Sequence, residues 1–189
     1  MKRFGCFSIF MAMWLAAAPL VAQNADSRPD TGIIYGAEYV NSYFGFSYRF
    51  PTAWSAAAAR ANMATSIYPL LTATPSGAGD GRYVAIEAER IRQDGSIRTA
   101  KDFLAVSVDM LTGPSSGFDS LPGDKRYTFG GREFDRIDLR SKAAPGSPVI
   151  RQAVVATVVR DYAIKFLFKA SSDAELEDLW HAGMNHLAG

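Results

Sequence analysis

The chain has 189 residues, of which 48% are hydrophobic and 21% are charged. This is the balance of a globular protein, and the length suits a single domain. The formal net charge of +1 gives no reason to expect nucleic-acid binding, which usually needs a strongly basic domain. No P-loop, H-E-x-x-H or C-x-x-C pattern occurs. We therefore expect no cofactor, no metal site and no nucleic-acid partner.

The amino terminus has the order of a secretory signal peptide. Lys2 and Arg3 precede a short apolar block at residues 7–15, and small residues with Pro19 follow it. A membrane-spanning helix needs about 20 apolar residues. The shorter block, with a proline at its end, therefore favours a cleaved signal over a retained anchor.

We expect residues 1–22 to be removed by cleavage after Ala22, with cleavage after Ala25 as the second choice. The only cysteine, Cys6, leaves with this segment, so the mature chain has no disulfide. A cysteine-free exported protein fits a bacterial periplasm, or secretion. The mature protein is expected to be a monomer without a stable membrane span.

The mature chain begins with polar residues and then becomes rich in aromatic side chains. Residues 23–35 are expected to form a flexible lead-in, and residues 36–189 one domain without an internal repeat. Aromatic segments at 37–41 and 46–50 predict two strands. The alanine-rich segment 55–65 is compatible with a short helix or with a loop.

Two further strands are predicted before the middle of the chain. Residues 67–74 have strand composition, but Pro69 lacks an amide donor and so favours an edge position. Residues 82–92 predict a long strand that ends at an Asp-Gly turn.

Two segments carry helix signals. Thr99 and Asp102 are spaced as an N-cap and its partner, and Ser172 and Glu175 form a capping box before the carboxy-terminal helix. The first helix is expected to bury one apolar stripe of Phe103, Leu104, Val106, Met110 and Leu111.

The last strands decide the predicted architecture. A Gly-Gly pair at 130–131 joins strands at 125–129 and 132–139, and strands at 149–159 and 162–168 follow. Residues 153–159 are apolar at nearly every position. This pattern predicts that both faces of the sheet are covered at its central strands. Short turns favour antiparallel pairing. The expected fold class is α+β, an α-β-α sandwich with a mainly antiparallel sheet and helices on both faces.

Residues 39–54 carry the order Gly-Phe-Ser, three residues, Pro, two residues, Trp. This resembles the opening of PsbP-like proteins, although Ala53 stands where that family usually has glycine. The wider superfamily is similar to a Ran-binding import factor and to exported DcrB-type proteins. The resemblance covers about residues 36–188 and implies a non-enzymatic binding or assembly-factor scaffold.

Aromatic and charged side chains supply a candidate binding surface. The alternative role of the aromatic residues is packing in the core. The alternative role of the charged residues, which alternate along strands, is to form solvated cross-strand ion pairs. The candidate residues are Tyr39, Tyr43, Arg136, Asp138, Arg140 and Arg151.

A Gly-Pro-Ser-Ser-Gly segment matches the G-x-S-x-G pattern of serine hydrolases, with Ser115 or Ser116 as the nucleophile. Asp119 or Asp138 and then His181 would complete a triad in chain order. A nucleophile elbow needs a strand before it and a helix after it, whereas here the order is helix and then loop. His181 and His186 would point about 140° apart on a helix, which disfavours a shared metal.

The sequence thus predicts an exported, non-catalytic binding or assembly-factor protein of the bacterial envelope. Its partner would be an envelope protein or a small ligand. One alternative is a periplasmic carrier of a small apolar ligand, with a pocket between the sheet and a helical layer. The weaker alternative is a serine hydrolase.

Overall fold

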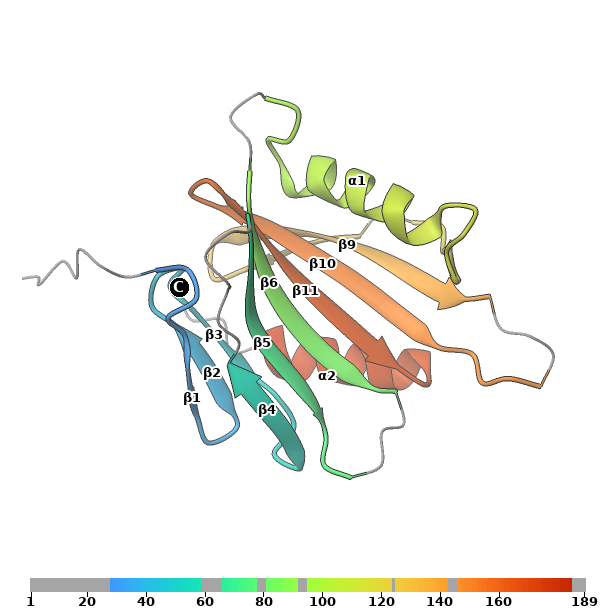
Figure 1. Cartoon of the computed structure of the whole chain (residues 1–189), viewed down its shortest axis with the longest axis horizontal. Helices are drawn as coiled ribbons and strands as arrows, with labels where there is room; N and C mark the ends of the chain where they lie inside the picture. The colour runs from blue at the N-terminus through green and yellow to red at the C-terminus, as the bar shows by residue number, and fades with distance from the viewer. Residues whose placement is uncertain are drawn as a thin grey trace, which may run out of the picture.

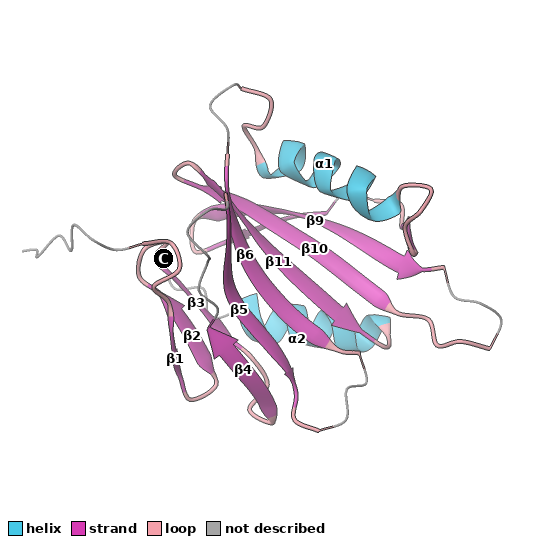
Figure 2. Ribbon diagram, in the orientation of Figure 1, coloured by secondary structure: helices cyan, strands magenta, loops and turns pink. Residues whose placement is uncertain are grey.

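The computed structural model describes residues 28–58, 66–77, 81–91, 95–123, 125–142 and 146–184. The predicted signal segment 1–22 and His186 lie outside these ranges. The described chain folds into one large antiparallel sheet, one small antiparallel sheet and two helices (Figures 1 and 2). No helix within the described ranges is long and apolar enough to cross a membrane.

Strands dominate the chain, and the helices come after the sixth strand and at the end. The elements are β1 (Ile33–Tyr35), β2 (Glu38–Asn41), β3 (Phe46–Arg49), β4 (Trp54–Ala58), β5 (Ile67–Pro75), β6 (Tyr83–Arg90), α1 (Ala100–Thr112), β7 (Phe118–Ser120), β8 (Lys125–Phe129), β9 (Arg132–Ser141), β10 (Arg151–Val159), β11 (Tyr162–Ala170) and α2 (Asp173–Met184).

The eight-stranded sheet has the order β4-β5-β6-β11-β10-β9-β7, and β8 also pairs with β9. The three-stranded sheet has the order β1-β2-β3. Neighbours pair antiparallel throughout the described strands. The α+β class and the mainly antiparallel sheet are therefore confirmed.

One face of the large sheet carries an aromatic core. Alternate side chains of β11, such as Phe166 and Phe168, point to this face, where Phe168 packs against Trp180 of α2. The small sheet adds Phe46 and Tyr48 to the same cluster. We call this side of the sheet the aromatic face.

The other face is packed by α1. Leu104 and Phe103 of α1 contact the intervening side chains of β10 and β11, including Val154, Ala156 and Ala163. We call this side the α1 face. The two helices thus pack on side chains of opposite parity, one helix to each face (Figure 1). The small sheet, which the sequence did not predict as a separate unit, shares the aromatic face with α2.

Several local expectations need correction. The alanine-rich segment begins as a strand, since β4 pairs with β5 from Trp54↔Pro75 to Ala58↔Leu71. β5 is not an edge strand, because β6 pairs on its other side. Pro69 is tolerated because it lies beyond the β4 pairing and next to a register shift. β1 lies inside the range 23–35 that was expected to lack regular structure.

The helix starts are confirmed, but the buried stripe of α1 is shifted. Thr99 Oγ1 accepts from the Asp102 amide and the Asp102 carboxylate accepts from the Thr99 amide, which is a complete capping box. The side chains of Val106 and Met110 were expected to be buried, but they are 48% and 71% exposed. Ser107 takes their place in the core by donating its hydroxyl to the Phe103 carbonyl.

Candidate binding groove

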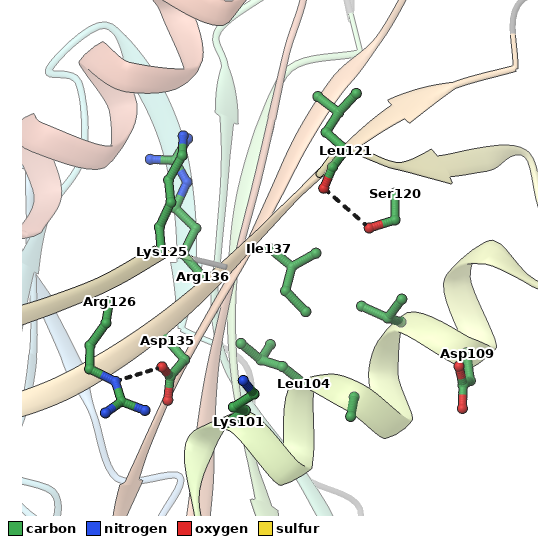
Figure 3. A pocket seen from close by; sticks show the side chains of 12 residues that line it. Lys101, Leu104, Asp109, Ser120, Leu121, Lys125, Arg126, Asp135, Arg136 and Ile137 are labelled. Atoms are coloured by element: carbon green, nitrogen blue, oxygen red, sulfur yellow. Dashed lines mark hydrogen bonds and ion pairs between the residues drawn. The ribbon is translucent and has the colours of Figure 1, made fainter. Parts of the chain in front are cut away.

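A groove of about 600 Å³ runs between α1 and the β7-β8-β9 side of the large sheet (Figure 3). We call it the α1 groove. Its apolar lining comes from Leu104, Val108, Leu121 and Ile137. Its charged rim comes from Lys101, Asp109, Arg126 and Asp135, whereas Lys125 and Arg136 line it but direct their charged groups to Asp138.

The periodicities of one helix and one strand produce this lining. Leu104 and Val108 are four residues apart on α1, so both side chains project on the same side of the helix. On β9 the alternation places Asp135 and Ile137 on the α1 face and sends the Arg136 side chain to the aromatic face. The Leu121 amide donates to the Asp138 carbonyl at 2.8 Å, which fixes the segment that closes the groove.

The rim carries one ordered ion pair, in which Arg126 Nε donates to Asp135 Oδ1 at 3.0 Å. Lys125 lies opposite Arg136 in the β8–β9 pairing, and its Nζ donates to Asp138 Oδ2 at 2.8 Å on the aromatic face. These hydrogen bonds raise the pKa of Arg126 and of Lys125. Both cations therefore stay charged at physiological pH, and Figure 3 shows the Arg126–Asp135 pair at one end of the groove.

A second hollow of about 480 Å³ adjoins this end of the groove. It is lined by Arg98, Arg126 and Arg132 together with Glu133 and Asp135, and we call it the arginine hollow. The two hollows share Arg126 and Asp135. An apolar groove therefore adjoins a polar hollow, and the Arg126–Asp135 pair lies at their shared border.

The two tyrosines predicted for a binding surface occupy different environments. Tyr39 is fully buried, its hydroxyl oxygen accepts from Asn41 Nδ2 at 2.9 Å, and burial raises its pKa to about 12. Tyr39 is therefore a core residue, and its predicted place on a surface is wrong. Tyr43 is half-buried, with its ring 6.0 Å from that of Tyr162 and 4.7 Å from the Arg160 guanidinium carbon.

Arg136 and Asp138 do lie together, but inside the protein. Arg136 is 1% exposed, and its Nε donates to Asp138 Oδ1 at 2.7 Å. Its two terminal nitrogens donate to the Glu177 carboxylate of α2 at 2.6 and 3.2 Å, and its guanidinium carbon lies 5.7 Å from the centre of the Trp180 ring. Burial alone would lower the pKa of Arg136, but the carboxylates more than offset this effect. Arg136 therefore connects β9 to α2 rather than forming an exposed binding surface.

Arg140 and Arg151 lie opposite each other in the β9–β10 pairing. Arg140 is exposed, whereas Arg151 Nε lies 3.0 Å from Asp173 Oδ1 of α2. The predicted charged residues thus share the aromatic face, but two of them are engaged with α2. They do not line the α1 groove with their charged groups.

The hydrolase triad is not assembled within the described ranges. The Ser116 hydroxyl donates to the Phe118 carbonyl, and the segment lies between α1 and β7, the reverse of a nucleophile elbow. Asp119 is paired with Lys142, and His181 Nε2 lies 3.7 Å from Glu177 on α2. The described part of the chain also contains no group of three or more potential metal ligands.

Sequence reasoning did not single out the α1 groove. The available signal was the four-residue spacing of Leu104 and Val108, with the charged residues Lys101 and Asp109 on the neighbouring helix positions. These positions lie beside the predicted buried stripe on the helix surface. The contribution of Ile137 depends on β9 lying under α1, and this is a tertiary relationship that the local pattern does not contain.

No family model and no curated protein matches this chain. The solution structure of cyanobacterial PsbP from Synechocystis sp. PCC 6803 matches with a TM-score of 0.56 at 14% identity, covering 82% of this chain and 94% of that chain. A crystal structure from Bacteroides thetaiotaomicron matches with a TM-score of 0.50 at 9% identity, covering 82% of this chain and 49% of that chain. The protein therefore has a PsbP-like fold, as the aromatic motif near its amino end indicated.

Proposed function

We propose that this is an exported, non-catalytic binding or assembly-factor protein of the bacterial envelope, and that the α1 groove is its binding site. The observation that carries the proposal is an open groove with an apolar lining and a charged rim. The PsbP-like fold and the signal-like amino terminus support it. The pairing of Asp119, His181 and Ser116 with other groups argues against hydrolysis.

The groove has the properties of a binding site. Its volume of about 600 Å³ lies in the usual range for ligand pockets, roughly 300–1,000 Å³. Apolar ligand surface placed on the half-buried side chains of Val108, Leu121 and Ile137 gains about 25 cal/mol per Å² removed from water. The rim charges remain accessible and can fix the orientation of the ligand.

One helix provides a matched test. Val108 lines the groove, whereas Val106, two residues earlier, is not among the groove residues and is 48% exposed. Val108→Asp should abolish binding by placing a carboxylate in the apolar groove, and Val106→Asp should retain it. Helix propensity changes equally in the two variants.

The readout is native mass spectrometry of each protein purified from its own cell envelope, combined with crosslinking. A small ligand appears as added mass, and a protein partner appears as crosslinks to α1. The expected result is retention with Val106→Asp and loss with Val108→Asp. Equal retention by both variants, or no bound molecule on the unmodified protein, would refute the proposal.

A second candidate function is the carriage of a small apolar ligand. The lining by Leu104, Val108, Leu121 and Ile137 favours it, because these side chains form an apolar surface between the sheet and a helix. Added mass without any crosslinked protein would select this function.

For the hydrolase alternative, hydrolysis that persists in a Ser115→Ala/Ser116→Ala double variant would exclude both serines as nucleophiles.

Export is tested separately. The intact mass of the protein from an envelope fraction should correspond to a chain that begins at Gln23. A mass that includes residues 1–22 would show that the signal is retained and would contradict cleavage after Ala22.

A further inference from the structure

We propose that the ligand of the α1 groove is an amphipathic anion, whose apolar part lies along the groove and whose phosphate or carboxylate group lies at the junction with the arginine hollow. This inference rests on the proposed function, since it names the chemical class that the groove would bind. It is carried by the continuity of the two hollows through Arg126 and Asp135.

The two adjoining hollows differ in the chemistry of their lining. The α1 groove offers the half-buried side chains of Val108, Leu121 and Ile137, which suit an alkyl or aryl body. The arginine hollow is lined by Arg98, Arg126 and Arg132 and by the acidic residues Glu133 and Asp135, and Arg126 stands at the junction with the groove. An elongated molecule with an apolar body and one anionic end complements both parts.

Arginine is the appropriate side chain for this anionic group. Its planar guanidinium binds phosphate and carboxylate through paired N–H donors. Arg126 uses Nε for Asp135, and its side chain remains 56% exposed at the junction. Arg132 directs one terminal nitrogen to the Phe44 carbonyl at 2.9 Å, so this end of its side chain is engaged on the side of the small sheet.

The anionic group would be bound by these side chains rather than by the amino end of α1. The Asp102 carboxylate already accepts from the amides of Arg98 and Thr99, and Thr99 Oγ1 accepts from the Asp102 amide. Because Arg126 already donates to Asp135, a ligand anion bound by Arg126 would compete with the Asp135 carboxylate. This competition predicts opposite effects for changes at the two partners of one ion pair.

The test is calorimetric titration with three probes: dodecyl phosphate, dodecyltrimethylammonium and inorganic phosphate, with the alkyl probes kept below their micelle concentrations. Dodecyl phosphate should bind at least tenfold more tightly than either of the other two. Its affinity should fall with ionic strength, because the contact at the exposed junction is charged.

Substitutions at the ion pair sharpen the test. Arg126→Gln should weaken dodecyl phosphate binding about tenfold, the effect of losing one charge-assisted contact. Asp135→Asn should strengthen it severalfold by removing the competing carboxylate. Arg140→Gln is the matched control, an exposed arginine on the same sheet but outside both hollows, and should leave binding unchanged.

Each contrary outcome identifies what has failed. Equal binding of the two alkyl probes, lost in both cases in Val108→Asp, would refute the anionic preference and leave the groove as a binding site. Inorganic phosphate binding as tightly as dodecyl phosphate would refute the amphipathic ligand. Failure of both alkyl probes to bind would also overturn this inference. The co-purification comparison of Val108→Asp with Val106→Asp decides the groove independently.

Discussion

The two faces of the large sheet are built from different side chains, although they share the same strands. The aromatic face packs Phe166, Phe168 and Trp180 with the rings of the small sheet, in contacts with centroid separations such as 5.9 Å for Phe168–Trp180. The α1 face packs mainly small and aliphatic side chains such as Ala156 and Ala163, together with Phe103 of α1. Large interlocked rings fill the first face, whereas the second keeps a groove beside its helix.

This difference separates stability from binding. Aromatic side chains each bury large areas and gain additional energy from tilted and edge-to-face contacts. Removing one should therefore destabilise the fold strongly. Side chains at the half-open α1 groove contribute less to folding and remain available to a ligand. The predictions below test this division, from the largest expected effect to the smallest.

The largest effect is expected at the centre of the aromatic face. Trp180→Ala should lower the free energy of unfolding by about 3–5 kcal/mol, because a fully buried ring leaves a cavity. Val108→Ala, at the half-buried groove, should lower it by less than about 1 kcal/mol. Urea unfolding followed by circular dichroism measures both. Equal losses in the two variants would contradict the division between the faces.

The buried charge on the aromatic face gives the next effect. Arg136→Ala should destabilise by about 3 kcal/mol, since it leaves Asp138 and Glu177 without their shared partner. Arg136→Met keeps approximately the side-chain volume while removing the charge. The double variant Arg136→Met/Glu177→Gln should recover much of the lost free energy of unfolding. A double-mutant cycle from urea unfolding measures the coupling between the two residues. A coupling energy near zero would show that the pair does not join β9 to α2.

The helix caps should have a smaller effect. Thr99→Ala removes the side chain that accepts from the Asp102 amide and should cost about 1 kcal/mol of stability. Ser172→Ala is its counterpart at α2, where the hydroxyl accepts from the Glu175 amide. Thermal unfolding of both variants measures the change. An increase in stability with Thr99→Ala would contradict the capping box.

The smallest effect is a pH dependence at the same cap. Hydrogen bonds from the backbone of Arg98 and from Thr99 lower the pKa of Asp102 below its usual value of 3.8. A depressed folded-state pKa stabilises the fold above the unfolded pKa, and this contribution is lost as the pH falls through the folded value. The stability difference between the unmodified protein and Asp102→Asn should therefore shrink below about pH 4. A difference that stays constant down to pH 2 would exclude this role.

The sequence predicted the elements whose patterns are local. The Gly-Gly hairpin joining β8 and β9, the cap at Thr99 and the apolar β10 strand are each encoded within a few residues, and the structure confirms them. The segment that begins β4 was ambiguous because alanine favours helices and offers no alternation. Pairing with β5 overrides that preference.

The candidate site was harder to predict because burial depends on distant partners. Arg136 looked like a surface residue on an alternating strand, but Glu177, 41 residues later, draws it under α2. Val106 and Met110 fit an apolar stripe that the docking of α1 leaves outside. The α1 groove arises from the same docking, so its lining could not be read from either segment alone.

Hydrogen exchange with and without dodecyl phosphate tests the division between the two faces most directly. We predict that added protection is confined to α1 and to the β7-β8-β9 side of the groove, around residues 100–112, 118–126 and 135–137. Protection should not change at β2 and β3 or at α2, which pack on the aromatic face. Protection centred on residues 38–49 or 173–184, with none at α1, would contradict the assignment of binding to the α1 face.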